Sequence, residues 1–128
     1  MKFREIELPS GIVAFMGRNS ENNDKLVNKY RGKKNKILHT VASGSPFCVI
    51  GELKPKREDV LLSAVACAFY SQDWKRNKRD IKVNIFTGKE VGRKWPWMKQ
   101  GSWKVKHSRT ITVKKKDILK FGRNRKKK

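Results

Sequence analysis

The sequence predicts an α+β fold, a single domain in which two main helices pack on a largely antiparallel mixed sheet. Two observations support this class. Short apolar runs bounded by Gly, Pro and Asn turns alternate with two longer segments of helical periodicity, in the order ββα, ββ, α, βββ. The chain has 128 residues, the ordinary size of one domain and enough to bury roughly two-thirds of its unfolded surface.

The N-terminal residues predict two strands followed by a helix. Apolar residues precede a turn at residues 9–11, and residues 12–16 form the return strand. Asn19 or Ser20 is suited to cap the helix, which ends at Gly32. The buried stripe of this helix is predicted to be Leu26, Val27 and Tyr30.

The middle of the chain predicts a basic loop at residues 33–36, two short strands and the longest helix. The strands span residues 36–42 and 46–50, joined by a Ser-Gly-Ser-Pro turn. Residues 58–74 have the clearest helical periodicity, with alanines that permit close packing on a sheet. The cluster at residues 75–79 carries more positive charge than a helix C-terminus requires.

The C-terminal part predicts three strands and a tail. A strand around Val83 is followed by a loop at residues 88–101, an alternating run at 103–107 and a second run that ends at Val113. One face of this ribbon is expected to be core and the other a row of cations. Residues 122–128 are predicted to be a disordered basic tail, which leaves residues 1–121 as the folded domain.

The charge of the chain indicates a polyanionic partner. Thirty-three Lys and Arg residues against 11 Asp and Glu give a net charge of +22. Self-repulsion of this size opposes compaction, so it is typical of proteins that bind nucleic acid. An anionic membrane is the second candidate, but no segment combines a clean amphipathic helix with exposed bulky apolar residues. We therefore expect a nucleic acid as partner and no membrane.

The protein is expected to be soluble and cytoplasmic. No run approaches the ~18 apolar residues of a transmembrane helix, and the first residues lack the apolar region of a secretory signal. Cys48 and Cys67 lie in apolar runs without C-x-x-C spacing, which favours buried thiols of a reducing compartment.

No catalytic or metal-binding motif is recognisable. Two histidines and two cysteines at unrelated spacings match no zinc pattern, and neither a phosphate-binding loop nor a G-x-S-x-G elbow is present. The spacing of Asp24, His39 and Ser45 does not support a hydrolytic triad, so a core or supporting histidine is favoured. We expect no enzymatic activity, no metal, no cofactor and no small-molecule substrate.

Aromatic and basic residues interleave before the C-terminal strands. Trp95 and Trp97 lie beside Arg93 and Lys94, and stacking of a base on an aromatic ring contributes about 1–3 kcal/mol. The Trp-Pro-Trp segment could equally fold over a sheet edge, and both interpretations stay open. For Trp103 we favour a place in the core.

Four segments together resemble a known family. The segments are FMGRNSENNDKLVNKY, ILHTVASGSPFCVI, AVACAFYSQDWK and KQGSW. Their order and spacing resemble those of the NFACT-R domain, which is the RNA-binding module of NEMF-type ribosome-associated quality-control factors. The resemblance covers residues 3 to 115, and the GSPFCVI form is most similar to the archaeal branch. It implies an RNA-contacting domain near ribosomal or transfer RNA, with the large ribosomal subunit as a candidate partner.

The chain also departs from the family. The other family domains do not fit in 128 residues, so the chain resembles a stand-alone version, and ribosome splitting and tail elongation are not implied. Where many relatives carry an acidic residue and a second histidine, this chain has Val41 and Ser43. That difference weakens any idea of a catalytic pocket around His39.

Residues 17–26 form a neutral, amide-rich corner in a chain that is otherwise basic. In a structural interpretation, Asn19 caps the helix and Arg18 pairs with Asp24. In a functional one, the helix N-terminus and Arg18 present donors to a phosphate or a splayed base. Glu21 and Asp24 would repel a phosphate placed there. We therefore favour an interpretation in which the corner is a structural brace that directs Arg18 or Asn19 toward a base or ribose.

The residues expected to contact RNA combine this corner with the basic and aromatic clusters. They are Arg18, Asn19, Asn23, Asp24, Lys33, Lys34, His39, Ser45, Lys75, Arg76, Arg79, Arg93, Lys94, Trp95, Trp97, Lys104 and Lys106. The alternative to a module for structured RNA is a protein that binds DNA or RNA non-specifically, or a ribosome-associated structural protein. An RNA-processing enzyme that uses Arg18, His39 and Ser45 is the least favoured class.

We predict that the affinity for RNA depends steeply on salt. With ~6–10 phosphate contacts, the affinity should fall about 10³–10⁵-fold between about 50 and 200 mM salt, because each contact releases a condensed counterion. Fluorescence anisotropy with a labelled RNA over a salt titration measures this slope. A flat titration would show that charge does not drive binding.

Overall fold

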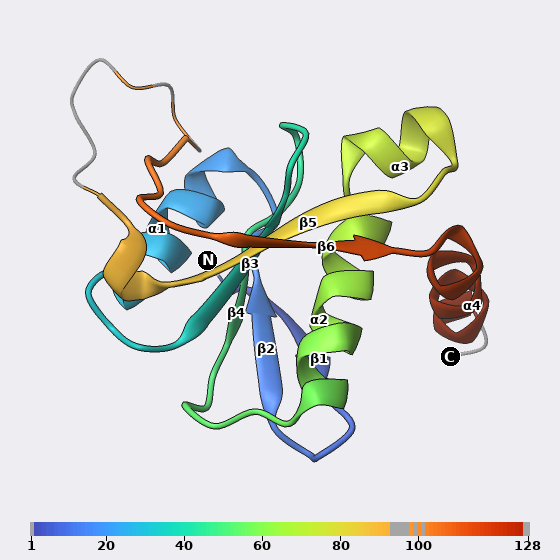
Figure 1. Cartoon of the computed structure of the whole chain (residues 1–128), viewed down its shortest axis with the longest axis horizontal. Coiled ribbons are helices and arrows are strands. Elements are labelled where there is room, and N and C mark those ends of the chain that lie inside the picture. The colour runs from blue at the N-terminus through green and yellow to red at the C-terminus, as the bar shows by residue number, and fades with distance from the viewer. Residues whose placement is uncertain (1, 93–97, 99, 101, 127–128) are drawn as a thin grey trace.

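A six-stranded antiparallel sheet organises the computed structural model, which describes residues 2–92, 98, 100 and 102–126. The strand order is β1-β2-β4-β3-β5-β6, and every pairing in it is antiparallel (Figure 1). The strands are β1 (Arg4–Glu7), β2 (Val13–Met16), β3 (Lys36–Thr40), β4 (Cys48–Ile50), β5 (Ile81–Thr87) and β6 (Arg109–Val113). The predicted α+β class is confirmed.

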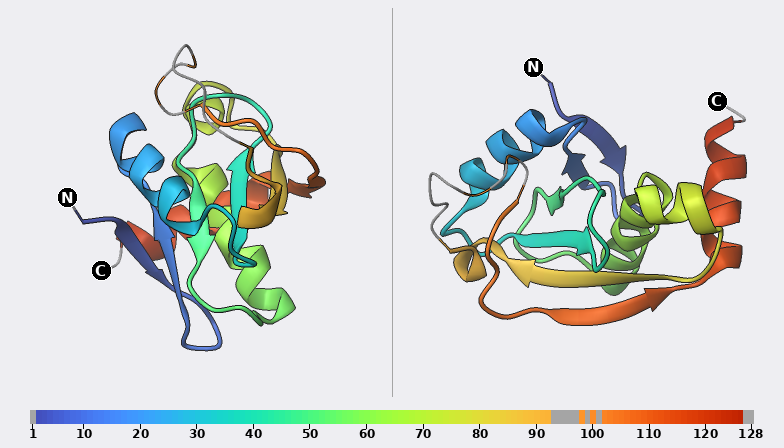
Figure 2. Two further views of the ribbon diagram at one scale, coloured as in Figure 1. Left: turned by 90° about the vertical axis from the view of Figure 1, so that its left-hand side faces the viewer. Right: turned by 90° about the horizontal axis from the view of Figure 1, so that it is seen from above.

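The described residues form four α-helices and one short 3₁₀ helix, η1. The helices are α1 (Ser20–Tyr30), α2 (Arg57–Phe69), α3 (Gln72–Asn77), η1 (Gly88–Glu90) and α4 (Lys115–Lys126). Helices α1 and α4 lie toward opposite ends of the molecule (Figure 2).

Both faces of the sheet are buried, because successive side chains on a strand point to opposite sides. Leu38 and Cys48 belong to the core on the side of α2, whereas Ile37 and Val49 belong to the core on the side of α1. Cys48 and Cys67 are free and fully buried, and burial raises the pKa of Cys67 to about 12. The two cores explain why the central strands have nearly continuous apolar sequences.

The helix predicted for residues 58–74 is two helices. The Ser71 hydroxyl donates to the carbonyl of Ala68 (2.7 Å) and accepts from the backbone N–H of Trp74 (3.2 Å). The same side chain therefore ends α2 and caps α3, because serine competes with the helical backbone for hydrogen bonds. The break places Tyr70 between the two helices and turns Lys75 away from the axis of α2.

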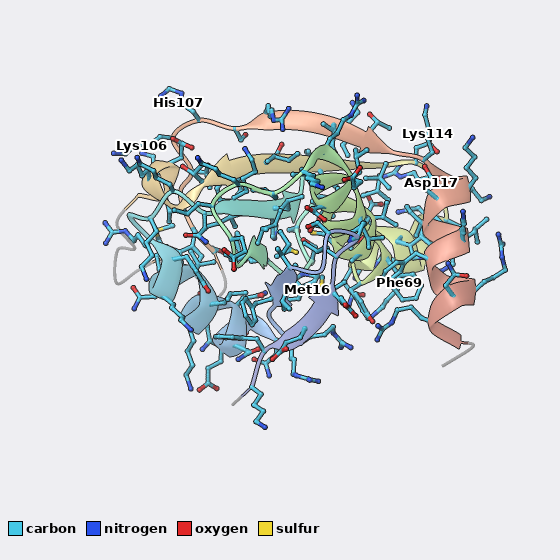
Figure 3. The ribbon with its side chains drawn as sticks, turned by 90° about the horizontal axis from the view of Figure 1, so that it is seen from below. Met16, Phe69, Lys106, His107, Lys114 and Asp117 are labelled. Carbon is cyan, nitrogen blue, oxygen red and sulfur yellow. The ribbon has the colours of Figure 1, made fainter. Side chains whose placement is uncertain are left out.

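Residues 103–107 are not a strand of the sheet, contrary to the prediction. A single isolated bridge joins Val91 to Val105, and Lys106 donates its backbone N–H to the carbonyl of Glu90. The segment thus pairs with the residues after β5, while β6 occupies the place next to β5 in the sheet. Lys106 lies at the end of the molecule opposite to α4 (Figure 3).

The predicted disorder from Gly122 onward is contradicted up to residue 126, because these residues belong to α4. Ile118 is fully buried, and Phe121 packs against Phe69 with ring centroids 5.2 Å apart. A Cβ atom on Gly122 would lie 2.8 Å from the Phe69 ring, so glycine allows this close approach. The predicted boundary after residue 121 falls inside a docked helix.

We predict that α4 is part of the cooperative fold. Replacing Ile118 by Ala should lower the free energy of unfolding by about 2–5 kcal/mol, because a buried side chain is lost. Leu119→Ala is the matched control, since the neighbouring side chain is 41% exposed. Urea denaturation followed by circular dichroism measures both variants. Equal, small losses would mean that α4 does not dock.

Candidate nucleic-acid interface

The corner between β2 and α1 is built from side-chain amides. Asn19 has an extended backbone, and its Oδ1 accepts from the backbone N–H of Asn22 (2.8 Å), which caps α1 as predicted. Asn22 is fully buried, and its Oδ1 accepts from the backbone N–H of Arg18 (2.9 Å). These reciprocal bonds fix the direction in which the chain enters α1.

A second amide connects this corner to the strand β4. The Oδ1 atom of Asn23 accepts from the backbone N–H of Phe47 (3.0 Å), and Gly17 donates its N–H to the Phe47 carbonyl (3.2 Å). A Cβ atom at position 17 would overlap the Asn23 side chain. Glycine is therefore required at this position, and the corner is held against the loop before β4.

The loop between β3 and β4 is closed by its own hydroxyl groups. Ser45 is buried, and its Oγ accepts from the backbone N–H of Thr40 (3.1 Å). The hydroxyl of Thr40 donates to the carbonyl of Ala42 (2.6 Å). The Gly44 carbonyl accepts from the backbone N–H of Gln72 (2.8 Å), which ties the loop to α3. Ser45 therefore has a structural role.

Polar side chains form a row across the sheet on the side of α1. The His39 ring stacks on Phe47 with a centroid distance of 4.3 Å, and His39 pairs in register with Asn84 on β5. The Oδ1 of Asn84 accepts from the hydroxyl of Thr110 on β6 (2.8 Å). Burial lowers the pKa of His39 from its ordinary value of 6.5, and hydrogen bonding with the backbone of Thr40 and Ser45 partly offsets this effect. His39 is therefore neutral at physiological pH.

These parts enclose a cleft of about 800 Å³. Its floor includes His39 and Asn84, and its sides come from the amide corner, the loop between β3 and β4, the beginning of α3 and the segment at 102–108. Six of the residues predicted to contact RNA line it, namely Arg18, Asn19, Asn23, His39, Ser45 and Lys75. Residues far apart in the sequence thus meet in one place.

Trp103 forms one wall of the cleft, whereas Asp24, which was predicted to contact RNA, does not line it. The Trp103 indole N–H donates to the Asp24 carboxylate (3.0 Å), and the half-buried ring packs against the core on the side of α1 while lining the cleft. Among the described residues no ion pair joins Arg18 to Asp24, so that part of the structural interpretation is wrong. The Nε of Arg18 donates instead to the carbonyl of Lys2 (3.1 Å).

The other predicted cations lie outside the cleft. They are exposed on the loop after α1, on α3 and its C-terminus, and on the segment that follows residue 102: Lys33, Lys34, Arg76, Arg79, Lys104 and Lys106. Arg79 pairs with Asp73 (2.9 Å). The remaining predicted contacts, Arg93, Lys94, Trp95 and Trp97, lie outside the described residues.

Several cleft residues were not predicted from the sequence. Asn84 and Phe47 belong to the floor, and Arg4, Tyr70 and Gln72 line the mouth. The alternation of β5 carried a signal for Asn84, because a polar residue stands between Val83 and Ile85 on the side that also carries the buried Phe86. No local pattern indicated Arg4 or Tyr70, because strand pairing and helix packing bring them together.

In the part of the chain that the structure describes, no three His, Cys, Asp or Glu side chains cluster as metal ligands would. Within the same residues no helix is both long and apolar enough to cross a membrane. A cleft lined largely by amide, hydroxyl and aromatic side chains, set in a strongly basic surface, is characteristic of a nucleic-acid-binding domain.

Comparison with protein families agrees with this class. Residues 2–107 match the family described as the NFACT protein RNA binding domain, and the chain belongs to that family. It is therefore an RNA-binding domain, as the motif resemblance implied. A family defined by RNA binding is consistent with the expectation that the chain is not an enzyme.

A solved structure has the same fold. The C-terminal part of the fibronectin/fibrinogen-binding protein from Streptococcus suis superposes with a TM-score of 0.79 at 22% identity. The similarity covers 94% of this chain and 49% of that one, so the chain spans about half the length of the structure it matches. No curated protein matches the sequence.

We predict that His39 makes the fold less stable in mild acid. Because the pKa of His39 is lower in the folded protein, the unfolded chain binds the proton first as the pH falls below 6.5. The stability that the neutral ring contributes is thus present above that pH and lost below it. Melting temperatures at about pH 7.5 and 5.5 should differ more for the wild type than for His39→Gln. Identical pH dependence would contradict this assignment.

Proposed function

We propose that this domain binds structured RNA, ribosomal or transfer RNA, and that the cleft receives a nucleotide unstacked from it. The observation that carries the proposal is the convergence of Arg18, Asn19, His39 and Lys75 on one cleft of about 800 Å³. Clefts that hold small organic ligands measure about 300–1,000 Å³, so the space suits a nucleotide.

The lining offers the groups that recognise an exposed base. Proteins bind single-stranded loops and bulges by stacking bases on aromatic or imidazole rings and by hydrogen bonding to base edges. The neutral His39 ring on Phe47 supplies the stacking surface, and Asn84 beside it supplies amide groups. Because Glu21 disfavours a phosphate at the start of α1, Arg18 is best placed to contact a base edge or ribose.

The proposed setting is the ribosome in the cytoplasm, within ribosome-associated quality control. Its support is the motif resemblance together with a net charge of +22, which fits a partner as dense in phosphate as ribosomal RNA. The archaeal-like character of residues 44–50 stays a prediction. A second candidate function, non-specific binding of RNA or DNA, is favoured by the exposed cations that lie outside the cleft, such as Lys33 and Lys104.

The test compares two variants that each remove one positive charge. Arg18→Ala should reduce the preference for the cognate RNA over an unrelated RNA, because Arg18 lines the cleft. Lys104→Ala should lower the affinity for both RNAs equally, by about twofold to fivefold, because an exposed lysine outside the cleft meets only phosphates. The cognate RNA comes from sequencing the RNA that copurifies with the protein.

Competition binding and melting curves on the same samples separate the possibilities. If Arg18→Ala lowers the melting temperature and leaves the specificity ratio unchanged, the corner is only a brace and the cleft is not the selective site. If the wild-type protein itself binds the two RNAs with equal affinity, the domain binds nucleic acid through charge alone.

A further inference from the structure

Two arginines from distant parts of the chain converge on Tyr70, between α2 and α3. The guanidinium carbon of Arg4, on β1, lies 4.2 Å from the centroid of the Tyr70 ring, and that of Arg125, on α4, lies 5.7 Å from it. An Nη atom of Arg4 also contacts the Tyr70 hydroxyl at 3.5 Å. Arg4 and Tyr70 line the mouth of the cleft together with Lys75.

No carboxylate compensates this pair among the described residues. Glu5 and Glu7 alternate with Arg4 and Ile6 on β1, so both glutamates point to the opposite face of the strand, and both are exposed. Asp73 near Tyr70 is bound by Asn77 and Arg79. Each guanidinium group therefore keeps N–H donors and a positive charge that a phosphate can bind.

The aromatic ring that holds the arginines is itself fixed by packing. Tyr70 contacts Phe69 edge-on with a centroid distance of 5.0 Å, and Phe121 lies 6.5 Å away. Gly122 allows α4 to approach this cluster closely, and Arg125 follows Phe121 by one helical turn on the same side. The two guanidinium groups are therefore positioned in advance of any ligand.

We propose that Arg4 and Arg125, both held against Tyr70, form a phosphate clamp in which they bind phosphates of the RNA backbone beside the cleft. The inference rests on the proposed function and extends it to the strand that leaves the cleft. A guanidinium presents planar N–H donors that match phosphate oxygens bidentately, and stacking on Tyr70 leaves these donors available. Arg125 lies outside the residues that match the family, so the clamp depends on α4 of this chain.

The test uses three single arginine-to-glutamine variants, one of which is a matched control. Arg4→Gln and Arg125→Gln remove the proposed contacts. Arg57→Gln removes an exposed arginine from the first position of α2, whose 13 residues place it about 20 Å from the Tyr70 end. Fluorescence anisotropy with a labelled RNA hairpin that has a single-stranded loop, measured over a salt series, gives the affinity and the salt slope.

The clamp predicts that Arg4→Gln and Arg125→Gln each weaken binding about fivefold and reduce the magnitude of the salt slope by about 0.7–0.9. The double variant should weaken binding more than either single variant and reduce the slope further, because each guanidinium group binds a phosphate. Arg57→Gln should change the affinity less than about twofold. Arg4→Lys retains the positive charge over Tyr70 but loses the planar N–H donors of the guanidinium group. It should therefore still weaken binding, even if Arg4→Gln fails to fold.

The outcomes that overturn the clamp are distinct from a failure of the proposed function. Equal losses for all three glutamine variants would mean that Arg4 and Arg125 act only through the general field. Loss of binding to phosphatidylserine vesicles with unchanged RNA affinity would assign the pair to a membrane surface. If the wild-type protein itself binds neither this RNA nor the copurified RNA, the proposed function fails, and the clamp with it.

Discussion

The hydrogen bond from the backbone of Phe47 to the side chain of Asn23 holds the two halves of the cleft together. One half is the start of α1, and the other is the loop that leads into β4. Both groups are buried, so an unpaired amide at either end would be costly, by about 1–3 kcal/mol. The bond requires glycine at position 17, because any side chain there would displace Asn23. Together with the bond from the Arg18 N–H to Asn22, this contact fixes the position of Arg18 beside the cleft.

Sequence periodicity predicted the helices and strands whose buried face is visible in their own pattern of apolar residues. The first hairpin, α1 and the strands around Leu38 and Val83 follow from alternation, helical spacing and an asparagine cap. Ser71 divided a predicted helix because its hydroxyl serves two helices at once, which helical periodicity does not reveal. In α4, one buried isoleucine and a glycine stand among six basic residues, so composition concealed a helix that only packing against Phe69 explains.

The candidate site was predicted only in part, because some of its residues are distinctive in the sequence and others are brought to it by the fold. Arg18, Asn19 and His39 stood out as unusual local sequence, and the fold brings them together. Asn84 and Tyr70 were missed because their role depends on register with β3 and on the turn between two helices. The exposed cations and the cleft contribute to binding in different ways. Dispersed cations supply long-range attraction to phosphate, whereas the cleft supplies amide and aromatic groups whose contribution depends on geometry.

The open sheet has a further consequence for association between copies of the protein. Strand β6 lies at one end of the strand order, and its backbone on that side could pair with a strand of another molecule. It carries Arg109 at its start and is followed by Lys114 and Lys115, all exposed. Two such edges approaching each other would bring like charges together, which disfavours pairing between copies. The same positive charge that suits a polyanion thus keeps concentrated copies of the protein apart.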